Sequence, residues 1–284
     1  MRRVRLTVAY DGTAFHGWQF QPGLRTVQGV LQEAIMGALG EEVRVDGSSR
    51  TDSGVHARGH ACAFTTASSV PTDKLPIVLN NELPADVRVV AARDEREDFQ
   101  PRFDSAGKHY HYTWFNGEID DVFSCRYVSR VRGPVDIDAM RAAAVFFEGQ
   151  HDFACLQNST ADTSVSTVRC LHLVRVAAPG DSLIRIDVIG NAFLYNMVRI
   201  LSGTLLEIGQ GRRAPGTILD ALRSGQRVDT GCTAPASGLC LEEVFFSDGD
   251  LERKAAVLRD ETFSDCSWLD CLCGRESILF ASGE

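Results

Sequence analysis

Two stretches near the N-terminus, RVRLTVAYDG at residues 3–12 and TVQGVLQEAIMGALG at residues 26–40, decide the kind of fold. Apolar residues fall at every second position of the first stretch: Val4, Leu6, Val8 and Tyr10. This alternation is typical of a half-buried strand, and the Asp-Gly pair after it is a turn signal. The second stretch has apolar residues at helical spacing between Thr26, which can cap a helix, and Gly40, which can end it. Together they predict a strand and a helix that packs on the sheet.

Further alternations of strand and helix follow along the chain. In the first half they predict strands at residues 43–45, 60–64 and 87–90 and a helix near residues 72–80. In the second half they predict strands at residues 108–115, 171–176 and 183–189 and helices at residues 138–148 and 196–208. This order favours a doubled α+β fold, in which each half is a mostly antiparallel sheet with helices on one face.

Length and composition fit a soluble globular protein. The 284 residues suffice for two domain-sized units, and the hydrophobic and charged fractions of 44% and 24% are ordinary. The N-terminus lacks the apolar run of a signal peptide, and no apolar run approaches the ~18 residues of a membrane-spanning helix. We therefore expect a cytoplasmic protein with no membrane partner.

We place the two halves at residues 1–103 and 104–247, followed by an acidic tail at residues 248–284. The tail contains a short amphipathic piece at residues 251–258, and much of the net charge of −9 belongs to it. A nearly neutral body can still hold a local basic groove, which matters more for binding phosphates than the total charge. The charge therefore neither supports nor excludes a nucleic-acid partner, and the role of the tail stays open.

The nine cysteines are an odd number and are scattered, so we expect reduced thiols. Three of them lie close together in the tail: Cys266, Cys271 and Cys273. Two pairs of histidines are also near one another in sequence: His56 with His60, and His109 with His111. None of these groups has the ligand number and spacing of a zinc site, so we expect no metal.

The polar loop SSRTDSGVHA at residues 48–57 places Arg50 two residues before Asp52, among small residues that let another chain approach closely. Two interpretations are open for it. Asp52 could bond backbone amides in an Asx-type turn, with Arg50 a solvated charge, and the segment alone favours this alternative. The loop could instead face a ligand.

This loop resembles the signature GRTDAGVHA of the TruA family of tRNA pseudouridine synthases, with Ser49 and Ser53 in place of its glycine and alanine. Further matches to that family follow in one order along the chain: YDGTAFHGWQFQ at 10–21, TVQ at 26–28, FQPRF at 99–103, KHYHY at 108–112, HDF at 151–153, NAF at 191–193, MVR at 197–199 and TAPASGL at 233–239. A lone RTD would arise by chance, whereas matches in this order along residues 4–246 are very specific.

The resemblance implies a fold of two ferredoxin-like (RRM-like) halves with the active-site cleft between them. It implies a homodimer that isomerises uridine to pseudouridine in the anticodon stem-loop of tRNA, at positions 38–40. No cofactor is expected, since this isomerisation needs neither redox chemistry nor a Lewis acid, and the chain has no P-loop or GxGxxG motif.

The resemblance also implies roles for individual residues. Asp52 matches the nucleophile, which attacks either the uracil C6 or the ribose C1′ of a flipped uridine. Arg199 matches its guanidinium partner, which would favour the ionised carboxylate by lowering its pKa. Tyr110 matches the ring that stacks on the target base, with Tyr112 and Trp114 left in the sheet.

The same resemblance assigns arginines to the RNA. Arg50 matches the arginine that enters the space vacated when the target nucleotide leaves the stack. Arg102, and more loosely Arg58, Arg212 and Arg213, are candidate contacts to phosphates, although each could equally be an ordinary surface charge.

Three rival functions remain open at this point. One is an RNA-binding or tRNA-chaperone protein that kept the fold and lost catalysis, and another is a synthase of the same fold that acts on a different RNA. The third is an acid/base hydrolase that uses Asp52 together with Asp11. The joint presence of Arg50, Asp52, Tyr110 and Arg199 argues against a protein that only binds.

Overall fold

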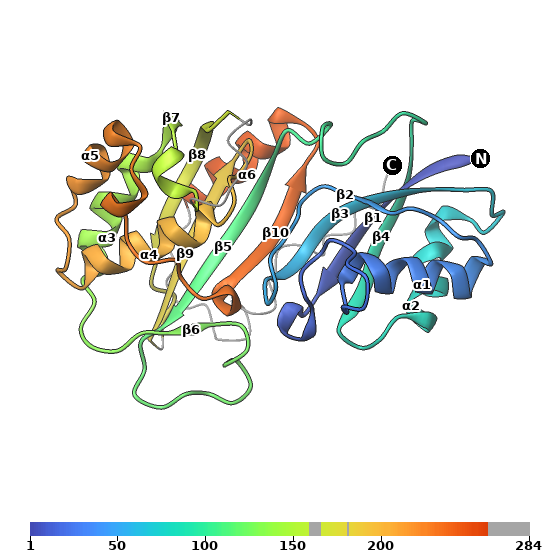
Figure 1. The fold of residues 1–284 in the computed structure, drawn as a ribbon, viewed down its shortest axis with the longest axis horizontal. Helices are drawn as coiled ribbons and strands as arrows, with labels where there is room; N and C mark the ends of the chain where they lie inside the picture. Colours follow the sequence, from blue (N-terminus) through green and yellow to red (C-terminus); the bar gives the residue numbers. More distant parts are fainter. Residues whose placement is uncertain (159–165, 181, 261–284) are drawn as a thin grey trace.

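The computed structural model describes residues 1–158, 166–180 and 182–260 of the chain. They form one continuous, mostly antiparallel sheet with helices packed on it (Figure 1). The strands are β1 (Arg2–Tyr10), β2 (Asp46–Gly47), β3 (His56–Thr66), β4 (Val87–Glu95), β5 (Gly107–Phe115), β6 (Ser129–Arg130), β7 (Gly149–Asp152), β8 (Val168–Ala177), β9 (Leu183–Gly190) and β10 (Leu239–Phe245). The sheet runs β4-β1-β3-β10-β5-β9-β8-β7, while β2 pairs with β3 and β6 pairs with β5.

Helices cover mainly one face of this sheet (Figure 1). Within the described ranges the α-helices are α1 (Val27–Leu39), α2 (Leu75–Glu82), α3 (Ile137–Ala144), α4 (Met197–Gly209), α5 (Thr217–Ser224) and α6 (Asp248–Asp260). The buried residues of α1 to α5 join the inward-facing strand residues in a single apolar core. The predicted α+β class, with a mostly antiparallel sheet, is confirmed.

The first strand and helix are confirmed almost residue for residue. α1 begins after Thr26, whose hydroxyl accepts a hydrogen bond from the Gly29 N–H, and it ends before Gly40, which adopts the left-handed φ of 69°. Both signals are local, because a cap residue acts on the turn next to it. The predicted elements in the second half also form, as β5, α3, β8, β9 and α4.

The predicted strand at residues 43–45 is wrong. Side chains of α1 take the backbone groups of Val45 instead: Gln28 Nε2 donates to its carbonyl at 2.7 Å, and its N–H donates to Gln32 Oε1 at 3.4 Å. A backbone held by a helix in this way is not available to the sheet. β3 begins at His56, earlier than the predicted start at residue 60, because its first residues pair with β10.

β10 was not predicted, and its place in the sheet positions the site. It lies between β3 and β5, although it is the last strand in the described residues. Its residue Leu241 pairs with Ala57 of β3 in parallel on one side and with Tyr110 of β5 in antiparallel on the other. With strands spaced about 4.8 Å apart, the start of β3 and Tyr110 are therefore separated by about 10 Å. The division of the chain near residue 103 stays a prediction, because the sheet continues across it.

α6 packs on the face of the sheet opposite the other helices. Three apolar side chains of this helix form a separate buried cluster with three strand residues: Leu251, Ala255 and Leu258 with Leu173, Ile189 and Phe245. The first part of the acidic tail therefore belongs to the fold. The cysteines at 266, 271 and 273 lie outside the described residues. Within those residues, no helix has the length and hydrophobicity needed to cross a membrane.

Candidate active site

The loop that carries Asp52 is held in place by the first strand and the loop after it. Tyr10 Oη lies 2.8 Å from Thr51 Oγ1, and the Trp18 N–H donates to the Thr51 carbonyl at 3.1 Å. His60 Nε2 bonds the Ser49 carbonyl at 2.9 Å and stacks on the Trp18 ring, with 3.8 Å between the ring centres. The residues just before Asp52 are thus fixed by the core.

Two glycines allow this close approach. A side chain on Gly12 would collide with the Val55 carbonyl, and one on Gly17 would place its Cβ 2.7 Å from the Thr51 carbonyl. Gly17 also has a φ of 85°, which favours glycine. Gly12 and Gly17 therefore let the backbone that follows β1 pack directly against the backbone of the loop that carries Asp52.

Asp52 and Arg199 meet at this loop, although they lie 147 residues apart in the sequence. Arg199 comes from the first turn of α4, and its Nη1 lies 3.4 Å from Asp52 Oδ2. The same Nη1 donates to Asn196 Oδ1 at 2.8 Å, and Nε donates to the Ala234 carbonyl at 2.7 Å. The guanidinium is thus oriented by two neutral acceptors and directs one edge at the carboxylate.

Burial raises the pKa of Asp52 above its ordinary value, and the Arg199 guanidinium lowers it by a smaller amount. The lowering by Arg199 agrees with the expectation from the sequence, whereas the larger effect of burial on the pKa of Asp52 was not anticipated. The carboxylate keeps only a quarter of its side-chain surface exposed, so lost hydration outweighs a single ion pair at 3.4 Å. The Asx-type turn is a poor description of Asp52, because its side chain pairs with a cation.

Tyr110 points from β5 into the same region. Its hydroxyl lies 3.1 Å from Ser49 Oγ, and its ring meets the edge of Phe193 at 5.1 Å. Tyr112, on the same face of the strand, is fully buried, and its hydroxyl hydrogen-bonds with the Ser129 hydroxyl and the Pro235 carbonyl. Both tyrosines belong to the core, but Tyr110 keeps 8% of its surface exposed and contacts the loop that carries Asp52.

The arginines assigned to RNA are placed differently from one another. Arg50 and Arg102 are exposed, and neither forms an ion pair within the part of the chain that the structure describes. Arg58 Nε lies 3.7 Å from Glu242. Arg213 is bound to Glu207 at 2.6 Å, and Arg212 bonds Gln210. Their roles in binding phosphate stay predictions.

Asp11 does not share a partner with Asp52. It accepts a hydrogen bond from the Tyr127 hydroxyl at 3.1 Å and lies 3.3 Å from His56 Nδ1. It also lines a pocket of about 410 Å³ that includes Arg58, His111 and Cys240. Because His111 alternates with Tyr110 along β5, this pocket opens on the opposite face of the sheet. The arrangement gives no support to a hydrolase that uses both aspartates.

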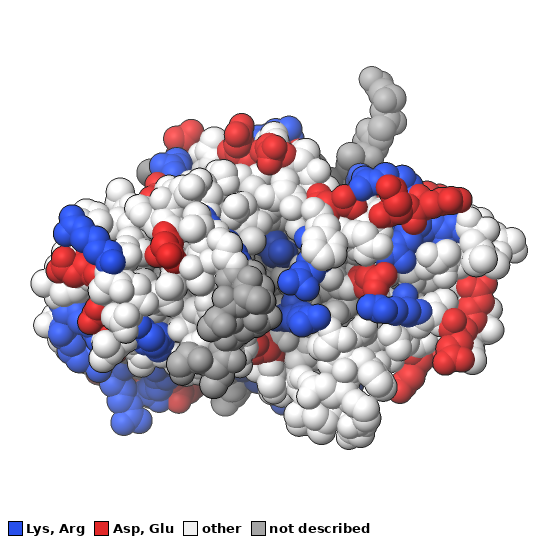
Figure 2. Space-filling model, turned by 45° about the horizontal axis from the view of Figure 1, so that its top comes forward, with Lys and Arg blue, Asp and Glu red and all other residues white. Residues whose placement is uncertain are grey.

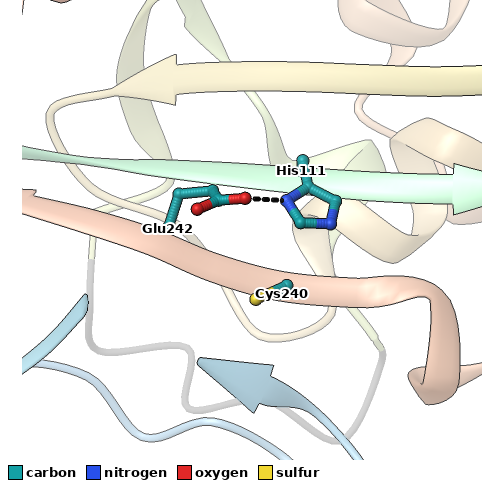
Figure 3. Close-up of side chains that lie close together, drawn as sticks. All are labelled: His111, Cys240 and Glu242. Atoms are coloured by element: carbon teal, nitrogen blue, oxygen red, sulfur yellow. Dashed lines mark ion pairs between the residues drawn. The ribbon is translucent and has the colours of Figure 1, made fainter. Parts of the chain in front are cut away.

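One group of potential metal ligands lies beside that pocket, within the described ranges: His111, Cys240 and Glu242 (Figure 3). His111 Nδ1 lies 2.6 Å from Glu242 Oε1, and the three ligand atoms fall within 4.8 Å of one another. The histidine pairs considered from the sequence did not indicate this group. Arg185 at 3.4 Å and Arg58 at 3.7 Å also contact the Glu242 carboxylate, so its charge is already balanced. We interpret the group as part of a buried ion-pair network.

Comparison with known proteins decides the family. A family model described as tRNA pseudouridine synthase matches residues 6–104 and 143–247. The tRNA pseudouridine synthase A of Brevibacillus brevis is 44% identical over 248 residues, which are 87% of this chain and 100% of that protein. The chain belongs to the tRNA pseudouridine synthase family. Enzymes of this family are isomerases that make pseudouridine in tRNA.

Other relatives have the same name. The tRNA pseudouridine synthase A of Citrifermentans bemidjiense is 43% identical over 87% of this chain and 99% of that protein, and tRNA pseudouridine synthase A 2 of Clostridium perfringens is 41% identical over 87% and 100%. A chain in a crystal structure of an archaeal box H/ACA sRNP Nop10–Cbf5 complex aligns with 89% of this chain and over 55% of its own length, at 13% identity. The TM-score is 0.37, so the likeness between the two structures is weak. Asp52 and Arg199 lie inside the two ranges that the family model matches, whereas Tyr110 lies in the unmatched segment between these ranges.

Proposed function

We propose that this pseudouridine synthase acts on uridines of the tRNA anticodon stem-loop, at positions 38–40, with Asp52 as the nucleophile. The observation that carries the proposal is the ion pair between Asp52 and Arg199, formed at a loop that the core holds rigidly. A carboxylate that reacts covalently must be ionised and must face a substrate, and this one is partly exposed beside a cation.

The reaction needs a covalent bond that can later break. The ionised Asp52 adds to C6 of the uracil or to C1′ of the ribose, and the bond between N1 and C1′ breaks. The base rotates and rejoins C1′ through C5, and the bond to Asp52 breaks, which returns the free carboxylate. The C5 hydrogen leaves to solvent as a proton, and N1 gains a proton. Because the carboxylate is already partly removed from water, it sheds little hydration when it attacks. Arg199 keeps it charged in that environment.

Tyr110 and Arg50 support the flipped state in this proposal. The Tyr110 ring is fixed by its hydroxyl contact with Ser49 and by the edge of Phe193, so it offers a preformed surface for the uracil. Arg50 is exposed two residues before Asp52 and is free to enter the stack that the uridine leaves. Figure 2 shows a hollow near the middle of one face with several Lys and Arg side chains around it, which supports binding of phosphates.

We also propose a homodimer that acts in the cytoplasm. Support for the dimer comes from an apolar loop between β5 and β6, in which three large side chains are 76–85% exposed: Ile119, Val122 and Phe123. A cluster of exposed apolar side chains on one loop is a common mark of an interface. The occupant we expect is a second copy of this chain.

Pseudouridine mapping tests the proposed positions. In total tRNA from cells that lack this protein, pseudouridine should be absent at positions 38–40, and it should return with the wild-type gene but not with Asp52→Asn. Unchanged pseudouridine at these positions would exclude the anticodon stem-loop as the target. Restoration by Asp52→Asn would exclude the nucleophile and favour another residue.

A further inference from the structure

Lys108 is a buried cation with no partner inside the described chain. Only 8% of its surface is exposed, and it lies two residues before Tyr110 in β5. Because side chains alternate along a strand, Lys108 is on the same face as Tyr110, at a distance of about 7 Å along the strand. Within the described ranges its ammonium has no hydrogen bond and no carboxylate within 4 Å.

Two arginines add to this positive charge. Burial, followed by the charges of Arg102 and Arg169, lowers the pKa of Lys108 to about 8. Arg169 binds only backbone carbonyls, those of Ser166 and Val168, and its Nε is buried without an acceptor. Neither arginine has an ion pair among the described residues. Three cationic side chains thus influence one another electrostatically, and among the described residues none of them pairs with a carboxylate.

Such an arrangement is costly unless an anion completes it. A buried charge normally has a partner, as Arg3 does: this side chain is 8% exposed and bonds Asp46 at 2.8 Å. Lys108 is buried to a similar degree and has no such carboxylate. A fold that keeps an unpaired ammonium next to two guanidinium groups is prepared for an anionic ligand.

The position of the cluster indicates which anion it receives. Gly190 of β9 lies directly across from Lys108 and contributes no side chain, and Arg169 lies on β8, the next strand. A uracil that rests on Tyr110 has its sugar and phosphates within a nucleotide's length of the ring. We propose that Lys108, with Arg102 and Arg169, binds a backbone phosphate of the RNA strand next to the uridine that lies on Tyr110. This inference rests on the proposed role of Tyr110 as the surface for the base.

Salt-dependent binding tests the inference. Lys108→Met keeps most of the volume and removes the charge, and Arg169→Met does the same for a second member. Either change should weaken binding of an unmodified tRNA transcript at low salt by about ten- to a hundredfold, the usual size for a charged hydrogen bond. The slope of log affinity against log salt should become shallower by about 0.7–0.9 for one lost phosphate contact. Lys74→Met is the matched control, because Lys74 is exposed and pairs with Asp73 at 3.2 Å.

Thermal stability separates a binding role from a structural one. If the Lys108 ammonium has no partner in the protein without RNA, Lys108→Met should melt at the same temperature as the wild type or higher. The reason is that the substitution removes an unpaired charge from a buried position. A clearly lower melting temperature would show that the fold itself satisfies Lys108 and would overturn the inference. Unchanged affinity and slope in Lys108→Met would overturn it as well.

Two further outcomes identify the ligand and the proposal that fails. Inorganic phosphate that stabilises the wild type but not Lys108→Met, with equal tRNA binding by both, would assign the site to free phosphate and overturn the inference. Binding of tRNA can be measured without turnover, so a failure of the proposed catalysis can be distinguished from a failure of the phosphate site. A wild type that forms no pseudouridine, together with a shallower slope in Lys108→Met, would reject Asp52 chemistry and keep the phosphate site.

Discussion

Asn196 precedes α4 with a φ of 61°, a left-handed conformation that is uncommon outside glycine. Its side-chain oxygen accepts from Arg199 Nη1 at 2.8 Å, the same atom that faces Asp52. One residue thus makes the sharp entry into the helix and orients the guanidinium. We assign Asn196 a positioning role for the ion pair.

Two substitutions of Asn196 separate these contributions. Asn196→Gly keeps the left-handed backbone and removes the acceptor, so kcat should fall about tenfold with unchanged tRNA affinity and melting temperature. Asn196→Ala should also lose about 1 kcal/mol of stability, because alanine is strained at this φ. Ser182→Gly, at the other described non-glycine residue with positive φ, should leave turnover unchanged. Full activity in Asn196→Gly would refute the positioning role.

The raised pKa of Asp52 predicts a stability effect with a definite sign. A carboxyl whose pKa is higher in the folded state favours folding when it is protonated, so the ionised form destabilises the fold at neutral pH. Asp52→Asn should therefore melt at a higher temperature than the wild type at pH 7, and the difference should shrink toward the ordinary carboxyl pKa of 3.8. Melting curves across this pH range measure it.

Asp86 is a control for Asp52, because its pKa is shifted in the opposite direction. Arg25 lowers the pKa of Asp86 through hydrogen bonds at 2.8 and 2.9 Å, so its ionised form stabilises the fold. Asp86→Asn should melt at a lower temperature at pH 7, and this loss should also shrink as the pH falls. If both variants shift in the same direction, the electrostatic description of Asp52 is wrong.

At the scale of elements, the sequence predicts what is decided locally. α1 is recovered because Thr26 and Gly40 act on adjacent turns. β10 is missed because its place depends on pairing with two strands that lie far away in the sequence, and the strand at 43–45 fails because Gln28 takes the Val45 carbonyl. The same limit applies to the site. The motifs indicated Asp52 and Arg199 through resemblance, whereas the burial of Lys108 required the folded sheet.

α6 provides the element-scale prediction. The sequence leaves the role of the acidic tail open, whereas in the structure this helix buries three apolar side chains against β8, β9 and β10. Truncation before Asp248 should cost about 3–6 kcal/mol of stability, since each of the two buried leucines, Leu251 and Leu258, contributes about 1.5–3 kcal/mol. Truncation after Asp260 keeps α6 and should therefore retain this contribution to stability. Equal denaturation curves for the two truncations would contradict the packing of α6.

At the scale of the whole molecule, the proposed dimer would use the exposed loop between β5 and β6. Phe123 is 85% exposed, so Phe123→Asp should not disturb the fold of the subunit. If this loop contacts a second copy, the charge should shift the protein toward monomers by at least tenfold in the dissociation constant. Sedimentation velocity measures the shift, and Val257→Asp, at a partly exposed position on α6, is the control. An unchanged dissociation constant would place the interface elsewhere.

If Asp52 attacks the uridine, tritium release from tRNA labelled at uridine C5 must depend on its carboxylate. Asp52→Asn nearly preserves shape while removing the charge and nucleophilicity, so turnover should vanish while filter binding of tRNA stays at the wild-type level. Arg50→Ala should slow release strongly without abolishing it, because only the support of the flipped state is lost. Wild-type release by a folded Asp52→Asn protein would contradict the mechanism.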